Sequence, residues 1–341
     1  MTDVQASSTL NNLYALLLSP TNDQISLLDL ADNRVKLSVK TGRNPQFLAV
    51  SPNKSHILVV NQLDGTISTF FREDNYRIRD LGTIGASGTP TDITFNSTGT
   101  EAYVADQTLG RITVLEILNR DRPKVKKIIS VRSDNEFTAI ASPFKVAVSQ
   151  DNNNLYAIDK NNGRVYTFNR QNNDFVQNLT INLSGQTRST PEEILFDKDK
   201  LYITDSTNST LITVDTKTNA VINTLSLTNQ DFRENLIPTR MAINSNAGKL
   251  YVVNNGTSSI AVVNINNNTL TKHISLATNT VSNAGGPSDI SVSDNGNTIY
   301  VTNTVGRNLS IISGTQDILL RNIGTSASAG ALVPLSAIKI I

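Results

Sequence analysis

The chain has 341 residues, of which 38% are apolar, and its 30 basic and 29 acidic side chains give a net charge of +1. A chain of this length can bury a large core, but a charge so near zero supplies no basic face for a nucleic acid. No apolar run approaches the roughly eighteen residues of a membrane span, and the absence of cysteine excludes disulfides, thiolate metal sites and cysteine nucleophiles.

In chain order, residues 12–40 contain three alternating apolar and polar runs, and a longer unit then begins to repeat about every fifty residues, a period typical of repeat folds. Each unit opens on a proline. The copies are PQFLAV from Pro45, PTDITF from Pro90, PFKVAV from Pro143, PEEILF from Pro191, PTRMAI from Pro238, PSDISV from Pro287 and a looser PLSAIKI from Pro334. Apolar residues at the third and fifth positions after the proline predict a strand with one buried face.

A second run follows each proline segment. The copies are ILVVN (57–61), AYVAD (102–106), LYAID (155–159), LYITD (201–205), LYVVN (250–254) and IYVTN (299–303). Turn residues, a third run such as GTISTF and a fourth such as AVINTLSL complete the unit. Four short runs rich in Val, Ile, Thr and Tyr predict four antiparallel strands per repeat.

A four-stranded sheet repeated at this period predicts a β-propeller, because one blade cannot cover both of its faces. Blades start near residues 45, 90, 143, 191, 238 and 287, and residues 12–40 with 334–341 complete a seventh blade. The sequence therefore predicts an all-β, seven-bladed propeller of four-stranded antiparallel blades. It forms a single domain over 1–341, closed by the N- and C-terminal strands in one blade.

The second strands end on a polar residue. The series is Asn61, Asp106, Asp159, Asp205, Asn254 and Asn303, and in the closing blade the alignment places Leu17 there. Side chains of Asn and Asp can accept a hydrogen bond from backbone two residues on. We expect an architectural role in the turn, with ligand contact as the alternative.

The second residue after each proline is charged in five consecutive repeats, with alternating sign. These residues are Asp92, Lys145, Glu193, Arg240 and Asp289, and Phe47 and Ser336 take the same position in the flanking copies. We predict that the five charges form a salt-bridged arc around the upper mouth of the central channel. The arc either fixes the register of the blades or binds a small polar ligand or ion.

The longest loops connect one blade to the next and are expected on one face of the ring. They span residues 132–142, 184–190, 228–237 and 277–286. A rigid ring that presents variable loops on one face favours binding there. Candidate contacts are Phe137, Arg188, Phe232 and Arg233, although each phenylalanine alternatively packs its own loop.

Residues for catalysis or metal binding are scarce. His56 falls in a turn between a first and a second strand, and His273 falls in a fourth, outer strand, so the two histidines do not converge. The sequence also lacks the serine-hydrolase, zinc-protease, dinucleotide and phosphate-loop motifs. We therefore expect no catalytic residues, no metal and no cofactor.

The strings LYVVNNGTSSIAVVN and IYVTN resemble the YVTN family of seven-bladed propellers, and the resemblance covers residues 12 to 341. Members include surface-layer, periplasmic and secreted proteins. The resemblance implies a non-catalytic binding or scaffold module. Lactonase-type propellers look similar too, especially against FLAVSPNKSHILVVNQLDGTISTFFRED. The alternative is therefore hydrolysis of a sugar lactone, and the missing histidine at the loop face argues against it.

The same resemblance implies an extracytoplasmic location, either periplasmic, secreted or at the cell surface. Met1 leads directly into the polar segment TDVQASS, which has no signal-peptide pattern. The expected partner is a protein, a glycan or a component of the cell envelope bound through the loop face. Membership of a larger surface assembly is a further expectation.

Overall fold

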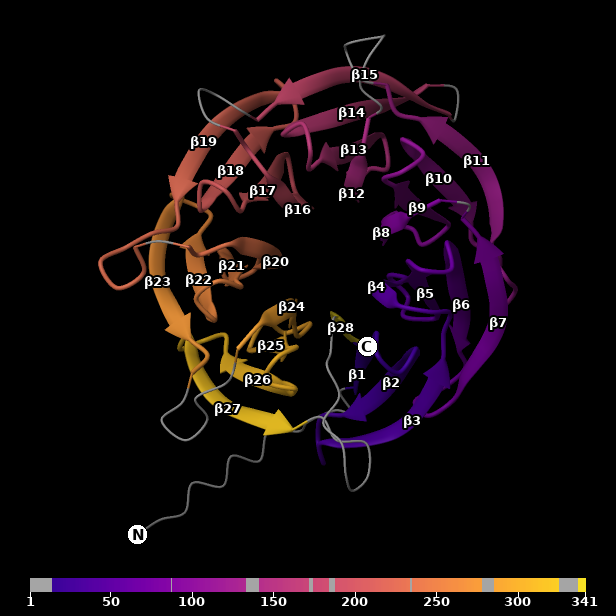
Figure 1. The fold of residues 1–341 in the computed structure, drawn as a ribbon, viewed down its shortest axis with the longest axis horizontal. Helices are drawn as coiled ribbons and strands as arrows, with labels where there is room; N and C mark the ends of the chain where they lie inside the picture. Colours follow the sequence, from indigo (N-terminus) through magenta and orange to yellow (C-terminus); the bar gives the residue numbers. More distant parts are fainter. Residues whose placement is uncertain are drawn as a thin grey trace.

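The computed structural model describes residues 14–86, 88–132, 141–171, 174–183, 188–233, 235–277, 285–324 and 337–341. These residues form 28 strands in seven four-stranded sheets. Figure 1 looks down the resulting ring, with the first strand of each sheet at the centre and the fourth at the rim. The all-β, seven-bladed propeller predicted from the repeats is thus confirmed. The described segments contain no helix long and apolar enough to cross a membrane.

Blades are numbered from the first proline repeat. Blade 1 contains β4 (Pro45–Val50), β5 (His56–Asn61), β6 (Thr66–Arg72) and β7 (Ile78–Gly85). Blade 2 contains β8 (Pro90–Phe95), β9 (Glu101–Asp106), β10 (Arg111–Glu116) and β11 (Lys124–Ser130). Blade 3 contains β12 (Pro143–Val148), β13 (Asn154–Asp159), β14 (Arg164–Gln171) and β15 (Asp174–Asn182).

The second half of the ring follows the same plan. Blade 4 contains β16 (Pro191–Asp197), β17 (Lys200–Asp205), β18 (Thr210–Asp215) and β19 (Ala220–Ser226). Blade 5 contains β20 (Pro238–Asn244), β21 (Lys249–Asn254), β22 (Ser259–Asn264) and β23 (Thr269–Ser275). Blade 6 contains β24 (Pro287–Val292), β25 (Thr298–Asn303), β26 (Asn308–Ser313) and β27 (Ile318–Gly324).

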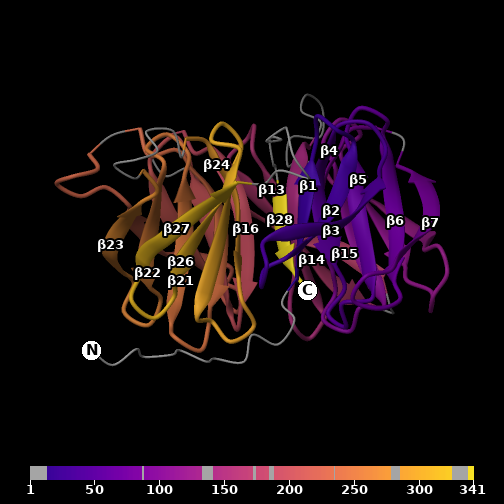
Figure 2. The same ribbon diagram turned by 90° about the horizontal axis from the view of Figure 1, so that it is seen from below.

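Blade 7 joins the two ends of the chain. Its strands, in spatial order, are β28 (Ala337–Ile340), β1 (Tyr14–Ser19), β2 (Gln24–Asp29) and β3 (Arg34–Lys40). Ile341 donates its N–H to the carbonyl of Tyr14 at 2.9 Å, directly after β28 ends. Figure 2 shows the ring from the side, with β28 beside β1 on its inner side. The closure of the ring therefore depends on pairing between the first and last strands.

The core lies between blades. Alternate residues of a strand point to opposite faces of its sheet, so one buried strand serves two interfaces. In β5, Val59 packs into the cluster shared with blade 7, whereas Leu58 and Val60 pack into the cluster shared with blade 2. Among the described residues, seven such apolar clusters occur, one at each interface.

Where the second strand ends on an aspartate, its carboxylate ties the loops at one face, whereas Asn61, Asn254 and Asn303 instead donate from Nδ2 to serine hydroxyls of the third strand. Asp205 accepts backbone N–H bonds from Thr207 in its own turn and from Thr190 in the preceding interblade loop, both at 3.1 Å. The prediction of Leu17 at this position in the closing blade was wrong. The residue there is Ser19. It ends β1 and pairs with Gln24 at the start of the next strand, as Asn61 pairs with Thr66 in blade 1.

A buried acid joins blades 2 and 3. Glu101 accepts hydrogen bonds from the Tyr103 hydroxyl at 2.7 Å, from Lys126 Nζ at 2.7 Å and from Arg170 Nη2 of blade 3 at 2.6 Å. Burial opposes ionisation of the carboxyl group, but these donors outweigh it and lower the pKa of Glu101 to about 2. The charge of this side chain therefore stabilises the folded ring.

The closing strand provides a test of how much the ring depends on it. Ile338 is fully buried between blades 6 and 7, whereas Ile318 on β27 is 43% exposed. Ile338→Ala should lower the free energy of unfolding by about 2–5 kcal/mol, because it removes buried methyl groups and leaves a cavity. Urea denaturation measures this loss, and Ile318→Ala is the matched control. An equal effect of the two substitutions would contradict closure through β28.

The Glu101 cluster predicts a pH dependence. Because the folded-state pKa of about 2 lies below the ordinary value of 4.5, the stabilisation is present above pH 4.5 and is lost as the pH falls towards 2. Glu101→Gln should therefore destabilise the protein near neutral pH, and the difference from wild type should shrink across that window. Urea midpoints measured at several pH values check this. The exposed Glu116→Gln should show no such convergence.

Candidate functional site

A cavity of about 630 Å³ lies in the central channel. Its walls are the inner strands, and its mouth is formed by the turns that join first and second strands, such as the one containing Asn96 and Ser97 and the one containing Ser149 and Gln150. We call the end of the ring with these turns the turn face and the end with the interblade loops the loop face. The cavity is therefore placed on the turn side of the channel, opposite the long loops.

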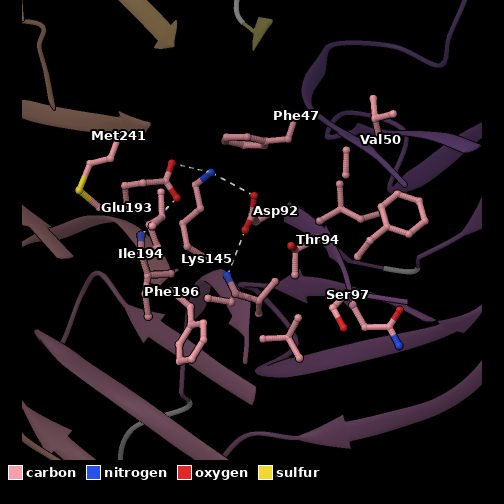
Figure 3. A pocket seen from close by; sticks show the side chains of 18 of the residues that line it. Phe47, Val50, Asp92, Thr94, Ser97, Lys145, Glu193, Ile194, Phe196 and Met241 are labelled. Carbon is pink, nitrogen blue, oxygen red and sulfur yellow. Dashed lines mark hydrogen bonds and ion pairs between the residues drawn. The ribbon is translucent and has the colours of Figure 1, made fainter. Parts of the chain in front are cut away.

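The five predicted charges line the inner end of this cavity and contact one another in sequence. Lys145 Nζ lies 3.0 Å from Asp92 Oδ1 and 3.3 Å from Glu193 Oε2. Arg240 Nη1 lies 3.3 Å from the same Glu193 oxygen, and Arg240 Nε lies 4.0 Å from Asp289 Oδ1. We call these five residues the arc. Figure 3 shows its centre, with Lys145 between Asp92 and Glu193.

An irregular strand start turns these side chains inward. In blade 3, Pro143 pairs with Asp159 and Lys145 with Ile158, so the register shifts between the two residues. The same shift follows the proline of the other five blades that begin with this repeat. Bulges of this kind redirect side chains, and proline is tolerated because the inner strand is an edge with no partner for its missing N–H.

Two carboxylates of the arc also bind the backbone of the next blade. Asp92 Oδ2 accepts the N–H of Val146 at 3.0 Å, and Asp289 Oδ2 accepts the N–H of Ile338 at 2.9 Å. Buried carboxylates held by charge-assisted hydrogen bonds are fixed in position. The arc is therefore a rigid set of charges, as well as a link between neighbouring blades.

Phe47 covers the two cations of the arc. Lys145 Nζ lies 4.0 Å and the Arg240 guanidinium carbon 4.7 Å from the centroid of its ring. Figure 3 shows the ring lying over the end of the Lys145 side chain. Phe47 occupies the position that bears a charge in the next five blades, and cation–π attraction holds the ammonium and guanidinium groups beneath it.

The bonding capacity of the arc is not exhausted at Asp289 and Arg240. Asp289 Oδ1 has only the 4.0 Å approach of Arg240 Nε among the contacts within the described residues. A guanidinium has five N–H donors, and the bond to Glu193 uses one of them. A carboxylate oxygen able to accept a proton thus lies beside a cation able to stabilise negative charge on a substrate oxygen.

The register of β28 corrects which residue of blade 7 stands at the level of the arc, and it reveals a residue that the sequence analysis missed. The predicted Ser336 lies outside the described residues, and the position equivalent to Asp289 is residue 337, since Ala337 pairs with Leu18 as Asp289 pairs with Thr302. Lys339 then enters the cavity wall. Alignment on Pro334 shifted this blade by one residue, so no sequence signal marked Lys339.

The candidates of the loop face do not join the cavity. Phe137 lies outside the described residues, and Arg188 and Arg233 are exposed. Phe232 is half-buried and stacks on His273 at 4.5 Å between ring centroids. It packs its own loop against blade 5, and none of the three described side chains lines the cavity.

The two histidines have structural contacts on separate blades. His273 Nε2 lies 2.8 Å from the Leu227 carbonyl, and its Nδ1 lies 3.3 Å from Asn254 Nδ2. His56, at the start of β5, contacts Ser55 Oγ at 3.0 Å and Phe71 edge to face. Burial lowers the pKa of both imidazoles. In the described part of the chain, no group of three or more His, Asp or Glu side chains is arranged to hold a metal ion.

Comparison with known proteins identifies relatives of this ring. A family model described as "Lactonase, 7-bladed beta-propeller" matches residues 16–334. No curated protein matches the chain. Among solved structures, a periplasmic gluconolactonase of Pseudomonas aeruginosa is 16% identical, with a TM-score of 0.77 over 96% of this chain and 99% of that one. A candidate 6-phosphogluconolactonase of Bacteroides fragilis is 17% identical, with a TM-score of 0.76 over 98% and 99%.

A protein of Lactobacillus plantarum is similarly related, at 18% identity and a TM-score of 0.77 over 97% of this chain and 99% of that one. At such identities the likeness of structures shows the fold alone, whereas the family match spans nearly the whole ring.

The expectation of a non-catalytic scaffold was wrong, and so was the expectation that the protein is not an enzyme, because the family that matches is one of lactonases. Both expectations gave too much weight to the missing histidine. Ester hydrolysis needs a general base and a group that stabilises negative charge, and neither has to be a histidine. The protein belongs to the lactonase family of seven-bladed β-propellers.

Proposed function

We propose that the protein hydrolyses a sugar lactone in the channel cavity. The observation that carries this proposal is the arrangement of Arg240 beside Asp289 Oδ1, at the inner end of a 630 Å³ cavity. A cavity of this size admits a monosaccharide lactone. The names of the structural relatives from Pseudomonas aeruginosa and Bacteroides fragilis support the same substrate class.

The reaction opens a cyclic ester with water. Asp289 Oδ1 accepts a proton as the water oxygen attacks the lactone carbonyl carbon, and Arg240 stabilises the negative charge that develops on the carbonyl oxygen. The bond between the carbonyl carbon and the ring oxygen then breaks. The departing oxygen takes the proton back from Asp289, and the product is a hydroxy acid.

The other arc residues position these two. Glu193 fixes the guanidinium through Arg240 Nη1, and Lys145 balances the charge of Glu193 from the other side. Phe47 covers one face of the guanidinium. Because these contacts exist before a substrate arrives, the charges need no reorganisation during the reaction.

Asp289→Asn should abolish most turnover while preserving the fold. The amide oxygen of asparagine can still accept the N–H of Ile338, but an amide does not take up the proton of the attacking water. We expect kcat for D-glucono-1,5-lactone, measured as acid release above the uncatalysed rate, to fall about 100-fold or more.

Glu192→Gln is the matched control. Glu192 lies on the inner strand β16, pairs with Lys160 at 2.7 Å and does not line the cavity. Its loss should leave kcat unchanged. Equal activity of wild type and Asp289→Asn would exclude this carboxylate as the base, and a wild-type protein that opens no lactone would exclude the function.

The YVTN-type ancestry and the extracytoplasmic location remain part of this proposal. The support is the IYVTN string of β25, together with a composition of only 17% charged residues. Fractionation of the source cells, with the lactonase activity assayed in each fraction, tests the location. Activity confined to the cytosolic fraction would contradict it.

A further inference from the structure

One layer of inner-strand residues is charged in blade 7 and uncharged in the other six blades. This layer lies two residues after the arc position, one step closer to the turn face, and its alanines pack between blades. In six blades it consists of Ala49, Thr94, Ala147, Leu195, Ala242 and Ser291. In blade 7 it is Lys339, which pairs with Leu16 as Ser291 pairs with Tyr300 in blade 6. The fold therefore does not need a charge at this level.

Lys339 also has no bonding partner among the residues that the structure describes. It is half-buried in the cavity wall and, within the described residues, makes no hydrogen bond or ion pair. The two cations of the arc, by contrast, each contact two carboxylates. The ammonium group of Lys339 therefore offers three N–H donors that no described residue accepts. A ligand in the cavity would supply an acceptor.

A second lysine that lines the cavity, Lys198, indicates from which end of the channel an anionic ligand enters. Lys198, in the turn between β16 and β17, likewise has no hydrogen bond or ion pair in the described part of the chain, but it is exposed at the mouth. Figure 1 shows β16 and β28 on opposite sides of the channel. An anion that enters from the turn face thus meets Lys198 at the rim and Lys339 inside.

The position of Lys339 suits the far end of a substrate held at Asp289. The N–H of Ile338 binds Asp289 Oδ2, so Lys339 follows directly after a residue in contact with the proposed base. Both side chains line the same cavity. A lactone whose carbonyl lies at Arg240 could therefore place a substituent beside Lys339 without leaving the cavity.

We propose that Lys339 is the specificity-determining residue of the site and binds the anionic group of an acidic sugar lactone that enters from the turn face. The anionic group is a phosphate or a carboxylate, since an ammonium ion binds either. The inference rests on the proposed function, because it names the substrate class of the same cavity. Lys339 recognises the substrate and takes no part in the chemical step.

Hydrolysis of three lactones by the full chain tests this. They are neutral D-glucono-1,5-lactone, carboxylated D-glucaro-1,4-lactone and 6-phospho-D-glucono-1,5-lactone. Lys339→Gln should lower kcat/KM for an acidic lactone 10- to 100-fold, which is the typical effect of losing a hydrogen bond to a charged group. It should leave the neutral lactone unaffected. The acidic lactone that loses the most identifies the anion.

Two further variants separate recognition from structure. Lys339→Arg keeps a cation and should retain most of the preference for the acidic lactone. Lys124→Gln, on the exposed strand β11, removes a lysine away from the channel and should change neither rate. If Lys339 only balanced the charge of the arc, Lys339→Gln would lower the rates for neutral and acidic lactones equally. That result would overturn the inference, and so would unchanged rates for all three.

Binding of inorganic phosphate, followed by calorimetry, distinguishes failure of this inference from failure of the proposed function. A wild-type protein that opens none of the lactones, yet binds phosphate through Lys339, would refute the lactonase proposal and keep the anion subsite. A protein that opens lactones with equal efficiency in wild type and Lys339→Gln would keep the lactonase proposal and refute the subsite.

Discussion

The structure depends on one constraint: each blade has two apolar faces, and only neighbouring blades can cover them. The side chains of β5 alternate between the cluster with blade 7 and the cluster with blade 2. A single sheet would leave both of these faces in water, so the blades are stable only as a closed ring. The pairing of β28 with β1 meets this requirement where the chain begins and ends.

Closure of the ring also creates the site. Seven inner strands converge on one axis, and each would expose an unpaired edge to the channel. Proline at the start of six of these strands removes a donor from that edge, and the bulge beside it turns the second residue after the proline inward. The same local feature that makes an edge strand acceptable thus gathers charges from different blades in one cavity.

The fold and the five charges of the arc could be predicted because both repeat with the period of the blades. Asp92 and Arg240 lie far apart in sequence, but each stands two residues after a repeat proline. Lys339 could not be predicted, since β28 takes its register from hydrogen bonds between the chain ends and not from a local motif. Ser19 was missed because β1 ends on a serine instead of the Asn or Asp of the other blades, although its pairing with Gln24 is local. Whether the cavity opens towards the turn face or the loop face depends on side-chain packing, which the repeat pattern does not encode.

An odd number of blades limits how charges can be arranged around the channel. Strict alternation of sign requires an even ring, so a closed circle of seven charges would force two like charges together. The arc avoids this by leaving the neighbouring positions of Phe47 and Ala337 uncharged. Parity therefore dictates a gap in the circle, and the gap spans blade 1 and the closing blade 7, so the ion pairs of the arc run only from blade 2 to blade 6.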